Sequence, residues 1–334
     1  GGEAVVGTIP VTFGENGAEC GAVENGSSKV TMTKNEGETG RYYVSIVPGV
    51  THSEGLLMTY YKGEEVTGTY QLNKQLAPVA NKIYNFGEFE PDFNYYVTAQ
   101  GAGNKSGLTW RDAMSFAQMV EEVFEGPAWK DEATYSCKKV LDDKYNGATF
   151  HIEEGEYEID EGWRALRYIN DELVTLTFRG GYDKETHKRD LVNSKTEFTN
   201  KHGNNILDVD YDDGCSDMDI TFDGIGFVNA KMSSSKNNAA FYSYCANGNV
   251  SITIKNCHFT GNTHVTDDDG SNGAALLIFS VKNVTIENTV FANNEAVCAP
   301  AITIADTKAT ITNCRFENNE ATKNAGVVYV NSGA

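Results

Sequence analysis

Four segments in the second half of the chain share one pattern at a near-constant spacing. In each, an alternating apolar strand leads to an Asn or a Gly, and a Phe follows three positions later. The segments span residues 220–227, 252–259, 284–291 and 309–316, and the Phe-to-Phe spacings are 32, 32 and 25 residues. Such self-similarity predicts a repeat architecture, because each repeat is too small to bury its apolar face alone and does so by stacking on its neighbours.

A second short strand is expected in every repeat, so that the chain winds through stacked coils. Parallel strands of neighbouring coils would lie about 4.8 Å apart. The second strands are expected at residues 239–244, 274–279, 301–304 and 326–330, and the regular repeats from about residue 219. Two internal stacks follow: Ile254 with Ile286 and Ile311, and Phe259 with Phe291 and Phe316.

Asparagine is expected at the corners of the coils. Asn256, Asn288 and Asn313 each lie three residues before a repeat Phe, and Gly224 takes this place in the first repeat. Asn adopts a left-handed backbone more readily than any residue except Gly. We therefore interpret these residues as architecture rather than as ligand contacts. Three more asparagines follow the last three Phe residues at a fixed interval: Asn262, Asn294 and Asn319.

The segment before the repeats opens with an expected strand at 94–98 and a glycine-rich loop to Gly107. A helix is expected over 109–124, because Thr109 can accept the Asp112 amide as an N-cap and apolar residues then recur three and four positions apart. Gly126 and Pro127 would end it. Strands are expected at 149–152 and 173–178, and the helix is expected to cap the first coil.

Residues 1–90 have a different texture. Short runs rich in β-branched and aromatic residues alternate with glycine and asparagine turns, which predicts a small β-sandwich. The runs are 5–11, 29–33, 41–47, 55–61 and 67–72, with a linker at 85–92. The expected fold is thus all-β: a β-sandwich over 1–90, then a parallel β-helix over 91–334 with an N-terminal capping helix.

Several of these motifs resemble a known group of proteins. The FxxN spacing followed by Gly273-Ala274-Ala275-Leu276 resembles the repeat of polymorphic outer-membrane proteins, although Gly-Gly-Ala-Ile itself does not occur. The stretch from Tyr95 to Ala113 is similar to the start of bacterial surface proteins with a pectate-lyase-like right-handed β-helix. Residues 80–87 are similar to the end of a fimbrillin-like β-sandwich. The resemblance implies a lipid-anchored surface protein of a Gram-negative bacterium, with the leader and the anchor absent from this chain.

The charge narrows the class of partner. The formal net charge is −20, which repels nucleic acid and anionic lipid headgroups and disfavours a strongly acidic polysaccharide unless cations intervene. No apolar run approaches the 18 residues or more that a membrane span needs. The seven cysteines are irregularly spaced and form no CxxC pair, so a structural zinc site is not indicated.

Signs of catalysis are weak. The Asn-Thr-Asp, Asp-Asp and Gly-His-Gly set of polygalacturonase-like enzymes does not occur on successive repeats, and His202-Gly203 is the nearest approach. Arg315 is the only arginine after residue 200. We therefore favour a noncatalytic cell-surface protein, an adhesin or a module that binds a polysaccharide or host glycoprotein. The alternative is a calcium-assisted polysaccharide lyase or glycoside hydrolase.

An acidic stretch is the best candidate for a metal site. Asp208, Asp210, Asp212 and Asp213 present hard oxygen ligands of the kind that Ca²⁺ prefers. If Asp208 and Asp210 lie in one strand they share a face, and adjacent carboxylates there would repel one another without a cation. The spacing does not match an EF-hand, and a solvated acidic loop is the alternative.

The last repeat leads to a further expectation. Its second strand, 326–330, is followed by only four residues, although a solenoid end needs a cap to cover unpaired backbone groups and apolar side chains. We therefore expect the natural protein to continue past Ala334. An uncapped end would associate end to end with a second copy.

Overall fold

The computed structural model divides the chain into two compact units, Gly1–Pro91 and Asp92–Ala334. In the first unit it describes residues 6–8, 11–14, 17–20, 24–27, 33–34, 42–43, 46, 51–52, 56–62, 65–72 and 75–79. In the second it describes residues 93–124, 139–159, 165–200, 203–211, 215–232, 239–245, 249–264, 273–324 and 326–331. Each unit is considered by itself below.

The described strands of the first unit form antiparallel pairs. The longest pair joins β7 (Leu56–Lys62) to β8 (Glu65–Leu72), close to the predicted strands at 55–61 and 67–72. The other pairs are β1 (Val6–Thr8) with β4 (Glu24–Ser27), β2 (Val11–Gly14) with β3 (Gly17–Cys20), and β5 (Thr33–Lys34) with β6 (Tyr42–Tyr43). Every sheet among these residues has two strands, so a β-sandwich stays a prediction.

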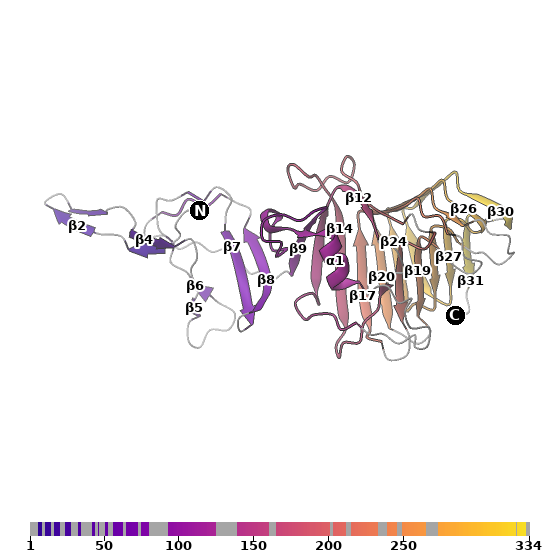
Figure 1. The fold of residues 1–334 in the computed structure, drawn as a ribbon, viewed down its shortest axis with the longest axis horizontal. Helices are drawn as coiled ribbons and strands as arrows, with labels where there is room; N and C mark the ends of the chain where they lie inside the picture. The colour runs from indigo at the N-terminus through magenta and orange to yellow at the C-terminus, as the bar shows by residue number, and fades with distance from the viewer. Residues whose placement is uncertain are drawn as a thin grey trace. The chain divides into compact units, whose positions relative to one another are not determined.

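The second unit is built mainly from parallel sheets (Figure 1). The long sheet has eight strands in the order β10-β9-β11-β14-β17-β20-β24-β28. Its strands are β9 (Asn94–Thr98), β10 (Met114–Ser115), β11 (Ala148–Glu153), β14 (Val174–Tyr182), β17 (Met218–Asp223), β20 (Val250–Lys255), β24 (Asn283–Glu287) and β28 (Lys308–Thr312).

Three further parallel sheets accompany the long sheet. The second sheet contains β12 (Gly155–Glu158), β15 (Thr196–Thr199), β18 (Ile225–Val228), β21 (His258–Thr260), β25 (Val290–Ala292) and β29 (Arg315–Glu317). The third sheet contains β13 (Ala165–Leu166), β16 (Leu207–Tyr211), β19 (Phe241–Cys245), β23 (Leu276–Phe279), β27 (Ile302–Ala305) and β31 (Val328–Asn331). The short sheet contains β22 (Thr263–His264), β26 (Glu295–Cys298) and β30 (Glu320–Asn324).

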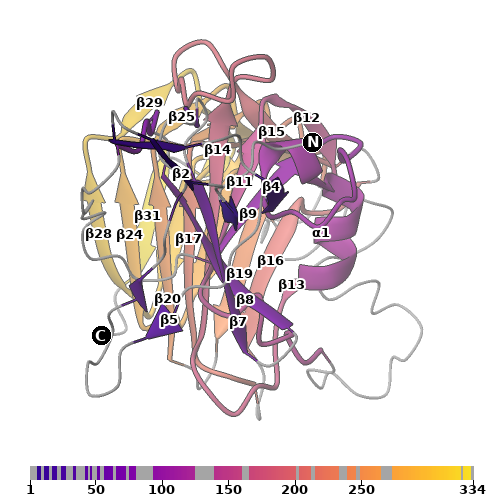
Figure 2. The same cartoon turned by 90° about the vertical axis from the view of Figure 1, so that its left-hand side faces the viewer.

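The chain visits the sheets in a fixed cyclic order. From β11 onward it passes through the long sheet, the second sheet and the third sheet, and each circuit adds one strand to each of them. The colours of Figure 1 therefore run from magenta to yellow along the stack. In Figure 2 the labels of β12, β15, β25 and β29 gather along the top of the view, which sets the second sheet apart from the long one. This mostly parallel arrangement is compatible with a β-helix.

The predicted register of the repeats is confirmed. Ile254 pairs with Ile286, which pairs with Ile311, and the predicted second strands at 274–279, 301–304 and 326–330 align as β23, β27 and β31. The rings of Phe259 and Phe291 stack with centroids 4.9 Å apart, and those of Phe291 and Phe316 at 5.3 Å. Burial is complete except in the last described circuit, where Phe316 is 38% exposed and Ile311 half-buried because no described strand covers them.

The in-register pairing of strands also includes circuits before residue 219, from which the regular sequence repeats were expected. Phe150, Phe178 and Phe222 already pair in sequence on β11, β14 and β17, and their rings stack at 5.5 and 5.2 Å. The first circuits lack the Asn corner and carry the inserted segment 183–195 between their strands. Their spacing therefore hides the repeat in the sequence.

Asparagines occupy the corners as predicted. Asn256, Asn288 and Asn313 have φ values of 54°, 50° and 51°, and Gly224 has 76° in the equivalent place. A second, buried set forms a ladder between circuits. The Asn294 side-chain oxygen accepts from the backbone and side-chain nitrogens of Asn262, both at 3.0 Å.

The predicted helix over Thr109–Phe124 is wrong in its first half. Thr109 does accept the Asp112 amide, but this cap starts only a 3-10 turn, Trp110–Asp112. Met114 and Ser115 then pair with β9, so the backbone is extended where a helix was expected. The α-helix α1 is Phe116–Val123, and the Ser115 hydroxyl caps it by accepting the Gln118 amide at 3.1 Å. Its Phe116 ring lies 4.5 Å from that of Tyr157, so α1 packs on the first circuit.

Candidate functional site

Two rows of polar side chains run across the outer face of the long sheet. Residues next to each other in a strand point to opposite faces, so the neighbours of the buried Phe178, Phe222, Ile254 and Ile286 face outward. One row is Thr177, Thr221, Thr253 and Thr285, and the other is His151, Arg179, Asp223, Lys255 and Glu287. We call them the threonine row and the charged row.

The threonine row is a repeated hydroxyl surface. Its four members pair in register on β14, β17, β20 and β24, and each is partly exposed. Among the hydrogen bonds of the described residues, none uses a hydroxyl of this row. Because adjacent strands lie about 4.8 Å apart, the row offers donors and acceptors at a regular interval to a ligand lying along the stack.

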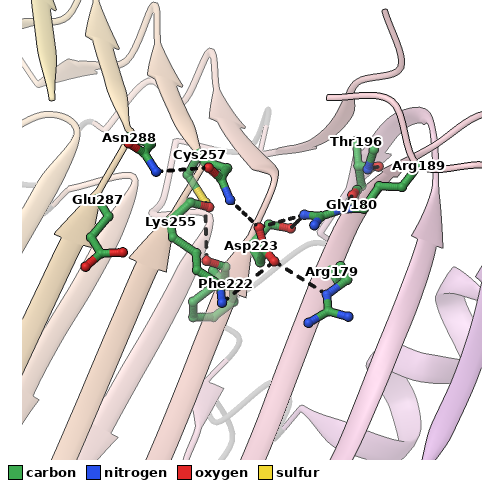
Figure 3. A network of polar contacts seen from close by, with 12 residues as sticks. Arg179, Gly180, Arg189, Thr196, Phe222, Asp223, Lys255, Cys257, Glu287 and Asn288 are labelled. Atoms are coloured by element: carbon green, nitrogen blue, oxygen red, sulfur yellow. Dashed lines mark hydrogen bonds and ion pairs between the residues drawn. The ribbon is translucent and has the colours of Figure 1, made fainter. Parts of the chain in front are cut away.

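Asp223 is the centre of the charged row (Figure 3). Its side chain is 4% exposed, although it lies on the outward face. Oδ1 accepts hydrogen bonds from Arg189 Nη2 at 2.6 Å and from Asn256 Nδ2 at 2.8 Å. Oδ2 lies 3.4 Å from Arg179 Nε and 3.9 Å from Lys255 Nζ.

This surrounding keeps Asp223 ionised. Burial by itself raises the pKa of the carboxyl, but hydrogen bonds from Arg189 and Asn256 and the charges of Arg189 and Lys255 outweigh it and hold the pKa below its ordinary value. A buried carboxylate that stays ionised does not act as a general acid. Asp223 therefore organises the cations around it.

The N-terminal end of the charged row holds a polar chain of neutral groups. His151 Nε2 lies 2.6 Å from Asn94 Oδ1 and donates to it, so Nδ1 accepts the Tyr182 hydroxyl at 2.6 Å. Burial, with the nearby charges of Arg179 and Arg189, lowers the pKa of His151 to about 3. Burial also raises the pKa of Tyr182, so its hydroxyl keeps its proton.

Aromatic rings cover this neutral group. The His151 ring stacks on Tyr96 at 5.1 Å, and the Trp110 ring lies 5.3 Å from Tyr182 and 4.6 Å from His187. His151 is consequently 9% exposed. It is enclosed rather than open to a ligand.

A separate contact between a histidine and a carboxylate lies on the outer face of the second sheet. His258 Nε2 is 3.0 Å from Glu197 Oε1 and reaches it across Gly226. A Cβ at Gly226 would lie 2.3 Å from His258 Nε2, so glycine leaves the space that the imidazole fills. The hydrogen bond from His258 lowers the pKa of Glu197, against a smaller effect of burial.

The predicted calcium ligands are only partly described. Asp208 and Asp210 both lie in β16, as the shared-face argument required, and Asp208 is buried and accepts a hydrogen bond from the Asn205 side chain. Asp212 and Asp213 lie outside the described residues. Within the part that is described, no group of three or more His, Cys, Asp or Glu side chains could hold a metal ion. The calcium site stays a prediction.

The cysteines divide into two kinds. Cys215 is disulfide-bonded, whereas Cys245, Cys257, Cys298 and Cys314 form no disulfide. Cys257 is buried, and burial raises the pKa of its thiol to about 12. It thus behaves as a small core residue.

The sequence reasoning missed the charged row. Arg179, Asp223 and Lys255 each directly follow a core position, but that signal becomes visible only when β14 is aligned with β17 and β20. Arg179 and Arg189 also precede residue 200, outside the region where repeats were recognised.

In comparisons with known proteins, no protein-family model, curated protein or solved structure matches this chain. No helix in the described portion is both long enough and apolar enough to cross a membrane.

Proposed function

We propose that residues 92–334 form a right-handed parallel β-helix of the surface-protein kind, carrying FxxN repeats and preceded by a fimbrillin-like β-sandwich. In this proposal the protein is a noncatalytic adhesin that binds a polysaccharide or a host glycoprotein. Its place is outside the cell or on the outer-membrane surface of a Gram-negative bacterium.

The threonine row is the observation that carries this proposal. An extended glycan presents hydroxyl groups at regular intervals, and a row of unbonded hydroxyls on successive strands can exchange hydrogen bonds with several of them. Each such bond contributes little alone, and several in series give useful affinity. The ionisable groups beside the row are tied to one another, which favours binding over acid–base chemistry.

The disulfide at Cys215 supports the proposed location. Disulfides persist in oxidising compartments, such as the periplasm and the cell surface, and are rare in the cytosol of most bacteria. The net charge of −20 fits a protein that stays soluble there.

A glycan array read with and without Ca²⁺ tests the function. Hits should weaken in a Thr221→Val, Thr253→Val double variant, because valine keeps the shape and strand propensity but removes the hydroxyls. Thr260→Val, on the outer face of the second sheet, is the matched control and should leave the hits unchanged. An array without hits, or equal loss in both variants, would refute the assignment.

A second candidate is favoured by one feature of the site. The His151–Tyr182 pair next to Arg179 places a neutral base, a hydroxyl and a guanidinium near each other, as a polysaccharide lyase or hydrolase would require. Enclosure of His151 argues against it. Product analysis of every array hit, with and without Ca²⁺, distinguishes the two, since only the enzyme shortens the glycan.

A further inference from the structure

The charged row contains more positive charge than its buried carboxylate neutralises. Arg189 and Asn256 both donate to Oδ1 of Asp223, at 2.6 and 2.8 Å, and Arg189 also donates to the backbone oxygens of Gly180 and Asp223 at 3.0 and 3.1 Å. Arg179 and Lys255 then lie on either side of the same carboxylate as additional cations. Asp223 supplies one negative charge among three cations, Arg179, Arg189 and Lys255, so a second anion here would reduce the repulsion between them.

Part of the hydrogen-bonding capacity of these two cations is unused. The Nε of Arg179 is buried and makes no hydrogen bond, whereas the guanidinium also hydrogen-bonds the Tyr182 side chain. Within the described part of the chain, Arg179 and Lys255 form ion pairs only with Asp223, at 3.4 and 3.9 Å. Both side chains are 35% exposed, so their outer ends face solvent. A guanidinium with free donors at the surface is a receptor for an oxyanion.

We propose that Arg179 and Lys255 together bind one carboxylate or sulfate group of an otherwise neutral glycan. The two cations flank Asp223 in register, from β14 and β20, and both approach the same oxygen atom. A single oxyanion above Asp223 therefore reaches both, with the guanidinium fork on one side and the ammonium on the other.

The surroundings select a single charge rather than a polyanion. Glu287 follows Lys255 directly in the charged row, so a second acidic sugar placed further along would meet a carboxylate. The net charge of −20 repels a polyanion as a whole. The threonine row lies two residues earlier on the same strands, where the neutral sugars adjoining the charged one would lie.

The identity of the carrier as a glycan rests on the proposed function, whereas the anion site rests only on the charged row. Acetate and sulfate are therefore the first probes, added at constant ionic strength in exchange for chloride. Each should produce a saturable shift of the Arg179 Nε–H resonance and none at Arg315, which is 65% exposed and pairs with Glu317. Lys255→Gln should weaken this binding roughly tenfold, and Lys282→Gln, which removes an equal charge from an exposed position, should leave it unchanged.

Oligosaccharides form the second arm of the test. Sialyllactose, which carries one carboxylate, should bind more tightly than lactose, and its advantage should disappear in Arg179→Gln and in Lys255→Gln. Polygalacturonate should bind less well than sialyllactose at low salt. The affinities for sulfate and for acetate, taken from the saturable shifts of the Arg179 Nε–H resonance, tell which oxyanion the site prefers.

Several outcomes separate the two proposals. A linear response to acetate and sulfate, or an equal response at Arg315, overturns the anion site whatever the glycan array shows. Saturable anion binding with no binding to any glycan keeps the site and rejects both the glycan carrier and the proposed function. Destabilisation by Lys255→Gln without any anion binding would mean that the row is a structural ladder of charges.

Discussion

Asn294 offers a quantitative test of what holds successive circuits together. It is fully buried, and its side chain donates to Phe259 O at 3.0 Å and to Asn319 Oδ1 at 2.8 Å. Its own side-chain oxygen accepts the Asn262 amide at 3.0 Å. In Asn294→Ala the Phe259 carbonyl and the Asn262 amide lose this partner in a buried place. An unsatisfied buried group costs about 1–3 kcal/mol, so the free energy of unfolding should fall by about 2–4 kcal/mol.

The neighbouring Asn293 is the matched control. It is exposed, has a φ of 55°, and accepts one long hydrogen bond of 3.4 Å from Asn318. Asn293→Ala should therefore cost about 1 kcal/mol, mostly because alanine adopts a left-handed backbone less readily than asparagine. Urea denaturation of both variants gives the two values, and hydrogen exchange locates the loss.

The exchange experiment has a definite expectation. The Asn262 amide should exchange much faster in Asn294→Ala, whereas the Phe241 amide, which donates to Ala275 on the third sheet, should change little. If Asn294→Ala costs no more than Asn293→Ala and the Asn262 amide stays protected, then the ladder does not bind the circuits together and the reasoning is wrong.

Three further predictions concern the site. Gly226→Ala should displace the His258 ring, because its Nε2 would lie 2.3 Å from the new Cβ. The pKa of Glu197, measured by NMR titration, should then rise toward its ordinary value. An unchanged pKa of Glu197 would exclude the contact. His151 has a folded pKa of about 3 against an ordinary 6.5, so the unfolded chain binds the proton first and stability should fall as pH drops through this window. His151→Gln should flatten that slope in urea titrations at a series of pH values, and an identical slope in both proteins would contradict the buried neutral imidazole. For the predicted calcium site, calorimetric titration should show heat that is lost in the Asp210→Asn, Asp212→Asn double variant, and a flat titration of the unsubstituted protein would remove the idea.

The interior of the repeats was predictable because packing restricts it strongly. An alternating apolar strand followed by an Asn corner and a Phe can place its side chains inside a coil in only one register, and Phe259 and Phe291 stack accordingly. The corner asparagines followed from backbone sterics alone. Earlier circuits escaped notice because Phe178 and Phe222 are 44 residues apart, with the inserted segment 183–195 between them, whereas the later repeats are 25 or 32 residues long.

Local signals were less decisive where two structures compete. Thr109 has the features of an N-cap and forms one, yet pairing of Met114 with Val97 on β9 satisfies the backbone better than continuing a helix would. The competing signal was present in Ser115 and Gln118, which match the Ser-x-x-Gln capping box that starts α1. Tertiary pairing of β10 with β9 decided which of the two caps starts the α-helix, and the sequence by itself does not contain that information.

The outer face was hardest to predict because packing does not restrict it, and this makes its exceptions informative. Asp223 is buried in a row whose other charged members are partly exposed, and the segment 183–195 makes that burial possible. Arg189 from this segment fits over Gly180 and Gly224, where a Cβ at Gly224 would lie 2.9 Å from Arg189 Nη2. Glycine at position 224 thus leaves room for the arginine that pairs with Asp223. Because Arg189 from the inserted segment pairs with Asp223, Lys255 and part of the Arg179 guanidinium stay available to a ligand, so the proposed anion site depends on the insertion and on Gly224.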